Sequence, residues 1–433
     1  MSKVTLSVIK ADVGSIGGHT KPSEPMLEAV RSRVRRASAN LLLDGLVTCT
    51  GDDIAIIMSH RRGVGAPDIH HFAWDCFLAA TEEAKAAGLY GAGQDLLVDA
   101  PSGNVRGAGP AVAEIEFVRD PRSKDRPAEA FLVFAADKCG PGAYNYPLYS
   151  VFCDPMHNGG LLLNPKMHQG FQLTIIDMDH NARDSDRVVR LDVPERGWDV
   201  ACLLQNPDRF AIEAIHSRYK PDDQVVSISA TRLHNIAGKY TGKDDPVAIV
   251  RTQGIFPAPE EVVEPYLLGH FVAGDCRGSH VMPLMPVAIN TPVAGAFCLP
   301  LVSCLAFSMD AGGIFSKDYV DLFGQRGLGR DAPEGPTKSR RVEAPRLRRC
   351  DHGLACRVGI HRNRGGTGCA RQRVRPAQRG AGCEQSGASL TGSLPDRLHH
   401  GSEQIEAAPG SRRLRALNPT QIFSTTPWFS TAF

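Results

Sequence analysis

One stretch of the chain, residues 238–246, concentrates groups that can do chemistry. It holds an amine, a phenol and two adjacent carboxylates within nine positions, namely Tyr240, Lys243, Asp244 and Asp245. Glycines at 238 and 242 permit tight turns, and Pro246 interrupts any regular element, so we predict a loop. A mobile catalytic lid and an ordinary solvated turn both fit this composition.

Lys243 is the most discriminating residue of this loop, because a lysine can form a Schiff base with a carbonyl substrate. That chemistry needs a depressed pKa, which burial or a neighbouring cation such as Lys239 can provide. Tyr240 lies three residues earlier and can serve the same substrate as a general acid or base.

Acidic and amide side chains recur where predicted strands meet turns. These residues are Asp12, Asp52, Asp53, Gln94, Asp95, Asp137, Asp244 and Asp245. Such positions can converge on one edge of a sheet, where clustered carboxylates would raise each other's pKa unless cations balanced them. Oxygen ligands suit Mg²⁺, so the pattern predicts several Mg²⁺ ions and a phosphate ester as ligand. Each residue taken alone also fits a plain turn, cap or local ion pair.

The elements that must position these groups follow from hydrophobic periodicity. Helices are predicted at residues 22–43, with Ser23 as N-cap, at 66–87, ending before Gly88, and at 198–205. Strands are predicted at 3–9, 45–50, 54–59, 112–118, 130–136, 171–177, 188–193, 210–215, 225–229, 247–250, 287–289 and 302–307. Strands 45–50 and 54–59 should form a hairpin, and 112–118 should pair with 130–136. Many strands with two early helices indicate an α+β protein with helices covering largely antiparallel sheets.

The bulk composition sets limits on function. A net charge of +2 argues against a nucleic-acid or membrane surface as the chain's main business, and no apolar run is long enough to span a bilayer. The 12 cysteines have no CxxC spacing, which favours reduced thiols in a cytoplasmic protein.

Composition changes sharply near residue 325. Residues 325–433 contain 18 arginines and one lysine, Lys338, and no helical or strand period survives there. We predict a catalytic domain at 1–324 and an aberrant, disordered, Arg-rich tail at 325–433, with a shifted reading frame as the hypothesis for its origin. The arginine clusters lack interleaved aromatic residues, so they give only an electrostatic signal for nucleic acid.

Long segments of the chain resemble one family, the bifunctional fructose-1,6-bisphosphate aldolase/phosphatases of archaea and deep-branching bacteria. The resemblance covers about residues 3–323 and is carried by segments 7–15, 51–53, 90–95, 102–107, 137–138, 141–145, 238–246, 277–280 and 283–286. It implies a four-layer α-β-β-α sandwich, dependence on several Mg²⁺ ions, a cytoplasmic, gluconeogenic role and a homo-octamer.

The resemblance also implies roles for single residues. Lys243 would form the Schiff base with dihydroxyacetone phosphate, Tyr240 would shuttle the proton as glyceraldehyde 3-phosphate adds, and Asp12 would accept a proton from the attacking water. The implied metal ligands are Asp12, Asp52, Asp53, Gln94, Asp137, Asp244 and Asp245. The implied contacts to the sugar bisphosphate are His19, Tyr90, Gly103, Asn104, Lys138, Gln253 and Arg277. The product of the hydrolytic step would be fructose 6-phosphate.

The chain departs from the family in two places. Cys298 stands where some members carry an aspartate, and nothing after Phe323 matches the family's acidic Glu-Leu-Glu-Tyr motif, whose tyrosine reaches the substrate. Two alternatives to the dual enzyme therefore stay open. One is a phosphatase without aldolase activity, and the other is a catalytically impaired remnant that acts as an assembly subunit.

Overall fold

The computed structural model describes residues 3–37, 39–118, 129–179, 186–234, 238–275, 279–293, 299–324 and 326–329. At 231–234, 238–241, 273–275, 279–280 and 326–329 only the backbone is described. Backbone contacts divide the chain into two units, Met1–Ser339 and Arg340–Phe433, and all described residues belong to the first. Residues 330–433 lie outside the described residues, and the predicted boundary between residues 324 and 325 stays a prediction.

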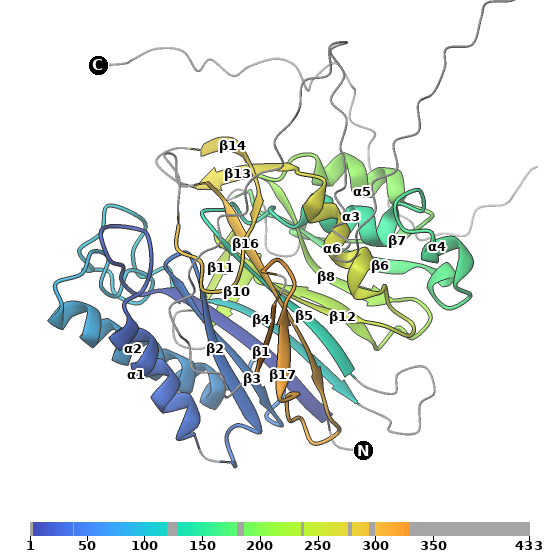
Figure 1. The fold of residues 1–433 in the computed structure, drawn as a ribbon. Helices are drawn as coiled ribbons and strands as arrows, with labels where there is room; N and C mark the ends of the chain where they lie inside the picture. Colours follow the sequence, from blue (N-terminus) through green and yellow to red (C-terminus); the bar gives the residue numbers. More distant parts are fainter. Residues whose placement is uncertain are drawn as a thin grey trace, which may run out of the picture. The chain divides into compact units, whose positions relative to one another are not determined.

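The N-terminal part of the chain forms a four-stranded antiparallel sheet in the order β2-β3-β1-β4. Its strands are β1 (Lys3–Asp12), β2 (Asp44–Thr50), β3 (Asp53–His60) and β4 (Ala111–Val118). Helices α1 (Glu24–Arg35) and α2 (Pro67–Ala86) lie side by side against this sheet (Figure 1).

A larger sheet follows, in the order β18-β17-β16-β5-β12-β9-β8-β6-β7, with β15 paired parallel to β16 and the remaining pairs antiparallel. Its strands are β5 (Glu129–Asp137), β6 (Phe171–Asp177), β7 (Val188–Val193), β8 (Phe210–Ser217), β9 (Gln224–Ile228), β12 (Val247–Thr252), β15 (Met285–Pro286), β16 (Leu301–Met309), β17 (Asp318–Asp321) and β18 (Arg326–Gly329). The associated helices are α3 (Asn145–Cys153), α4 (Gly160–Leu163), η1 (Met167–Gln169), α5 (Gly197–Leu204) and α6 (Pro259–Leu267). Two separate hairpins are β10–β11 (Thr231–His234, Gly238–Thr241) and β13–β14 (Phe271–Asp275, Ser279–Pro283).

The apolar side chains of the central strands β1 and β5 are buried on both faces. In β1, Leu6 and Val8 belong to a cluster shared with the larger sheet, whereas Ile9 faces the cluster beneath α1 and α2. In β5, Val133 belongs to the cluster shared by the sheets and Phe134 to the cluster beneath α3 and α6. Burial of alternate residues on opposite faces explains why these strands are almost continuously apolar.

The structure confirms the mixed α and β content and most of the predicted elements. The hairpin of β2 and β3 is present, and α2 ends just before Gly88, whose φ of 64° suits glycine. Ser23 occupies the N-cap position of α1 but makes no side-chain capping bond. Among the described residues, no helix combines the length and apolar character needed to cross a membrane.

Several predictions of local structure are wrong. The helix predicted to reach residue 43 ends at Arg35, and residues 287–289 are not a strand. β4 and β5 do not pair with each other, because β4 pairs with β1, and β5 pairs with β12 and β16. The stretch 238–246 is not wholly a loop, since Gly238–Thr241 is strand β11.

A buried chain of hydrogen bonds joins β1, β3 and β4. It starts from Ser7, which lies on the face of β1 opposite to the face of Asp12. His60 Nδ1 accepts from Arg62 N (3.2 Å), so Nε2 carries the proton and donates to Ser7 Oγ (2.8 Å). Ser7 Oγ then donates to Glu114 Oε1 (2.6 Å), whose other oxygen accepts from Gly65 N (2.6 Å). Burial lowers the pKa of His60 to about 4, so the folded state holds this ring neutral.

This chain predicts an acid-dependent loss of stability. Between pH 6.5 and pH 4 the unfolded chain binds a proton at residue 60 that the folded chain does not, so stability falls as pH falls. At pH 5 the expected loss from His60 alone is about 2 kcal/mol. Urea unfolding at pH 7 and pH 5 should therefore show a larger fall in the free energy of unfolding for the wild type than for His60→Gln, which does not titrate. Equal falls in the two proteins would contradict the conclusion that the folded state holds His60 neutral.

Candidate active site

The polar cluster lies where the ends of several strands meet. Asp12 is the last residue of β1 and pairs in register with Asp53, the first residue of β3. Asp137 ends β5, and Asp245 lies just before β12, which pairs with β5. Asp95 joins them because its backbone N donates to Asp12 O (3.0 Å). The convergence expected from strand-end positions is therefore found.

Oxygen and nitrogen atoms of the cluster fall into two groups, each with its potential ligand atoms within 4.8 Å of one another. The groups are Asp12, His19 and Asp52, and Asp53, Asp137 and Asp245. They touch where Asp52 N donates to Asp137 Oδ2 (3.2 Å). Gln94 Nε2 donates to Asp12 Oδ2 (2.8 Å), which brings a further predicted ligand to the first group.

Glycine is required beside this contact. Gly51 has a φ of 58°, and a Cβ placed on it would lie 1.5 Å from Asp137 Oδ2. The predicted Gly-Asp-Asp turn is therefore held close to β5 by the absence of a side chain at residue 51.

Among the described side chains, cations lie between the carboxylates but do not balance them. Lys138 Nζ is 2.5 Å from Asp52 Oδ1 and 2.9 Å from Asp137 Oδ1, and Lys10 Nζ contacts Asp53. His19 Nδ1 lies 3.0 Å from Asp52 Oδ2. With Lys243 included, four cationic groups in the described part of the chain face seven carboxylates: Asp12, Asp52, Asp53, Asp95, Asp137, Asp244 and Asp245.

The pKa values report this imbalance. Burial first, and then neighbouring carboxylates, raise the pKa of Asp12, Asp53, Asp137 and Asp245 above its usual range. Burial opposes the shift of Asp52, but Lys138 and His19 hold its pKa below the usual range. Hydrogen bonds with Asp12 and Asp52 raise the pKa of His19 to about 10.

These residues fit divalent cations. Asp137 Oδ1 is buried and accepts no hydrogen bond from a described residue, although Lys138 Nζ lies nearby without hydrogen-bond geometry. An excess of buried carboxylate oxygens with raised pKa values is the donor set that hard cations such as Mg²⁺ prefer.

Strained backbone supports the cluster. Lys138 (φ 62°) and Asp245 (φ 48°) both adopt the left-handed region, which costs a non-glycine residue on the order of 1 kcal/mol or more. Asp245 N donates to Cys139 O (2.8 Å), and Cys139 N donates to Asp245 Oδ1 (2.8 Å). This reciprocal pair fixes Asp245 beside the end of β5.

A half-exposed rim adjoins the first group of ligands. The rings of His19 and Tyr90 meet edge to face at 5.0 Å, and Asn104 Nδ2 lies 3.3 Å from His19 Nε2. Gly103 N donates to the Tyr90 hydroxyl (2.9 Å). Four of the residues implied to hold the sugar bisphosphate therefore lie together beside the carboxylates.

Lys243 reaches the cluster, but its pKa is not depressed as predicted. Its Nζ is buried 3.2 Å from Asp95 Oδ1 and 3.0 Å from Asp244 Oδ1. Burial alone would lower the pKa of Lys243, but Asp244, Asp95 and Asp245 outweigh burial and hold it well above its usual range. The amine is therefore protonated in this arrangement.

Some predicted site residues lie away from the cluster, and others are outside the part of the chain that the structure describes. Gln253 follows the far end of β12, six residues beyond Val247 and so about 20 Å along the strand, and its side chain is exposed. Arg277 and Cys298 lie outside the described residues, as do the side chains of Lys239 and Tyr240.

Sequence reasoning missed one member of the site. Lys10 was given no role, although its Nζ contacts the predicted ligand Asp53. Asp95 was predicted as part of the acidic cluster, and it accepts from Asp12 N (2.9 Å) and lies 3.2 Å from Lys243 Nζ. The signal for Lys10 was present: a lysine in an otherwise apolar strand, two residues before Asp12 and therefore on the same face.

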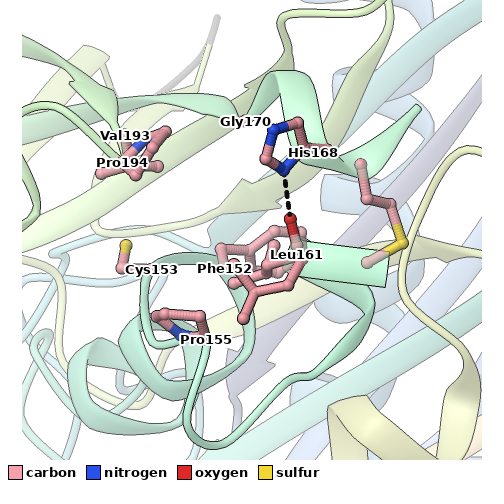
Figure 2. Close-up of a pocket in the computed structure, with 10 residues that line it drawn as sticks. Phe152, Cys153, Pro155, Leu161, His168, Gly170, Val193 and Pro194 are labelled. Atoms are coloured by element: carbon pink, nitrogen blue, oxygen red, sulfur yellow. Dashed lines mark hydrogen bonds between the residues drawn. The ribbon is translucent and has the colours of Figure 1, made fainter. Parts of the chain in front are cut away.

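A separate apolar pocket lies at the Phe171 end of β6. It has a volume of about 70 Å³ and is lined by residues such as Phe152, Leu161 and Pro194, with His168 Nδ1 3.3 Å from Leu161 O (Figure 2). None of the clustered carboxylates lines it. It is too small and too apolar for a bisphosphate.

Comparison with known proteins decides the family. A profile described as fructose-1,6-bisphosphatase matches residues 3–332. The chain belongs to this family. It is 54% identical to the fructose-1,6-bisphosphate aldolase/phosphatase of Thermus thermophilus over 321 residues, which cover 74% of this chain and 85% of that protein. Two proteins of the same name also match. The one from Cenarchaeum symbiosum is 48% identical, with 74% of this chain and 83% of that protein covered. The one from Methanocaldococcus jannaschii is 43% identical, with 76% of this chain and 81% of that protein covered.

The charge imbalance predicts an unusual response to substitution. Asp245→Asn keeps the acceptor for Cys139 N and tolerates the left-handed φ, but it removes one repelling charge. In EDTA we expect it to raise the free energy of unfolding by on the order of 1 kcal/mol, as substitutions at strained active sites do. The rise in unfolding temperature on adding Mg²⁺ should shrink.

Asp177→Asn is the control, because Asp177 accepts two hydrogen bonds from Arg209 (3.0 and 2.8 Å) outside the cluster. It should lower stability and leave the Mg²⁺ response intact. Destabilisation by Asp245→Asn in EDTA would contradict the imbalance.

Proposed function

We propose that this chain is a Mg²⁺-dependent enzyme that acts on fructose 1,6-bisphosphate in two reactions. One condenses dihydroxyacetone phosphate with glyceraldehyde 3-phosphate through Lys243, and the other hydrolyses the 1-phosphate to give fructose 6-phosphate. The observation that carries this proposal is a buried lysine beside a cluster of carboxylates that outnumber the cationic groups of the described side chains. The aldolase/phosphatase names of the relatives support both activities.

The metal ligands would come from the two groups already described. Asp12, Asp52, Asp53, Gln94, Asp137, Asp244 and Asp245 would hold the ions. Bound Mg²⁺ would neutralise phosphate oxygens and lower the pKa of a nearby water. With the carboxylates so balanced, His19 and Lys138 would turn from Asp52 toward the phosphate or sugar hydroxyls.

Asp12 is suited to accept a proton in the hydrolytic step. Burial and neighbouring carboxylates raise its pKa, which increases its basicity when it is ionised. Gln94 Nε2 orients one of its oxygens, and Gly14 N donates to the other (3.2 Å). Tyr90, Gly103 and Asn104 would bind the sugar on the side of His19.

Lys243 must lose a proton before it can act as a nucleophile. Asp95 and Asp244 lie within hydrogen-bond distance of Nζ and are the nearest acceptors. The free amine would add to the ketone carbon of dihydroxyacetone phosphate, and loss of water would give the imine. A base then removes a proton from the adjacent carbon, the resulting enamine adds to the aldehyde, and water releases the product. Tyr240 is the proposed proton shuttle, by resemblance.

We also infer a four-layer α-β-β-α arrangement and a homo-oligomer. Three apolar clusters, one between the sheets and one beneath each set of helices, support the layers. Large exposed apolar side chains, among them Trp198 (80% exposed) and Met156 (91%), support assembly of several copies.

A phosphatase without aldolase activity is the second candidate, because Lys243 is protonated and ion-paired in the described arrangement. Lys243→Arg separates the two. Arginine can keep the ion pairs with Asp95 and Asp244 but cannot form an imine, so we expect loss of condensation with Mg²⁺-dependent hydrolysis retained within about threefold, roughly 0.7 kcal/mol.

Borohydride reduction in the presence of dihydroxyacetone phosphate should label the wild type at Lys243 and leave Lys243→Arg unlabelled. An unlabelled wild type that still releases phosphate would establish the phosphatase alone. Absence of phosphate release with every divalent cation would refute the proposed enzyme and favour an assembly role.

A further inference from the structure

A short segment after β15 lies against the turn that carries Asp52 and Asp53. We call residues 288–293 the strap. Asn290 N donates to Cys49 O (2.7 Å), and Cys49 N donates to Asn290 Oδ1 (2.9 Å). Asn290 thereby extends the edge of β2 with one backbone and one side-chain hydrogen bond.

The strap also contacts the turn itself. Gly51 N donates to Thr291 O (2.8 Å), directly beside Asp52. A Cβ placed on Gly51 would lie 2.9 Å from Val293 Cγ2, so the strap packs tightly on the turn. Val293 N donates to Thr20 O (2.8 Å), next to His19. One segment therefore holds both the turn that carries Asp52 and the loop that carries His19.

The strap is anchored at its other end by a buried carboxylate. Asp321 Oδ2 accepts from Ile289 N (3.0 Å), and Asp321 Oδ1 accepts from Gly324 N (2.8 Å). Asn290, the residue after Ile289, adopts a left-handed φ of 62°, which asparagine tolerates better than most residues. The hydrogen bond between Ile289 N and Asp321 therefore lies directly beside the two hydrogen bonds of Asn290 with Cys49.

From these contacts we propose that Asn290 is a positioning residue of the metal site. It contacts no candidate ligand, but it fixes the strand end from which Asp52 and Asp53 project, against the mutual repulsion of the clustered carboxylates. Partners that orient metal ligands without binding the metal commonly change metal affinity 10- to 100-fold when they are removed. This inference rests on the metal site of the proposed function and assigns to residue 290 a role that no sequence motif indicated.

The test measures Mn²⁺ binding to the purified full chain by the electron paramagnetic resonance signal of the free ion, without any assay of activity. Asn290→Ala should weaken Mn²⁺ binding at least tenfold. Asn290→Asp keeps the acceptor and the left-handed φ, and it should bind within about threefold of the wild type or tighter. Asn290→Gly keeps the backbone conformation but lacks the side-chain acceptor, so its Mn²⁺ affinity should also fall about tenfold. If Asn290→Ala does not fold, the affinity of Asn290→Gly tests the proposal instead.

Asn158→Ala is the matched control. Asn158 is buried, its Oδ1 accepts from Gly160 N (2.9 Å) and its Nδ2 donates to Val151 O (2.8 Å), far from the turn in sequence. Its loss should lower the unfolding temperature without changing Mn²⁺ affinity. Mn²⁺ binding by Asn290→Ala and Asn290→Gly within twofold of the wild type would overturn the proposal, as would an equal loss in Asn158→Ala. A wild type that binds no Mn²⁺ would overturn the metal site of the proposed function and this role with it.

Discussion

Repulsion among buried carboxylates is the constraint on which this structure depends. Among the residues that the structure describes, seven aspartates meet at one edge of two sheets with four cationic groups between them, and burial leaves four of the carboxyl groups with raised pKa values. Such a cluster would relax if its backbone were free to move. Several devices prevent this: the left-handed residues Lys138 and Asp245, the side-chain-free approach at Gly51, and the strap at Asn290. Local strain of this kind clusters at functional sites, which supports the proposed cation site.

The rest of the chain provides the rigidity that this arrangement needs. Three apolar clusters bury both faces of the central strands, so the strand ends that carry the aspartates cannot shift independently. The groups proposed to bind the substrate are held differently. His19, Tyr90 and Asn104 lie on turns and contact one another through single hydrogen bonds or ring edges, so the proposed role would let them exchange partners for a phosphate.

Much of this could be predicted from sequence, because strand ends and turns are local signals. Alternation located β1, β3 and most strands of the larger sheet, and the recurrence of aspartate after them predicted the cluster. Partner choice between strands depends on contacts far apart in the chain, so the pairing of β4 with β5 was predicted wrongly. The low pKa predicted for Lys243 is wrong because Asp244, the next residue, and Asp95, 148 residues away, both lie against its amine and raise the pKa. The contact with Asp95 depends on the fold, which the local sequence does not show. Asn290 acts through Cys49, 241 residues away, and no motif marks it.

Anomalous diffraction from crystals of this chain soaked in Mn²⁺ would test the central claim most directly. The account predicts anomalous peaks about 2.1 Å from carboxylate oxygens of both groups, with Lys10 and Lys138 displaced from Asp53 and Asp52. A crystal saturated with Mn²⁺ that shows no peak at the cluster, with both lysines still paired to their aspartates, would contradict it. The carboxylates would then be a structural ion-pair network, and the chemistry proposed for the site would have no foundation.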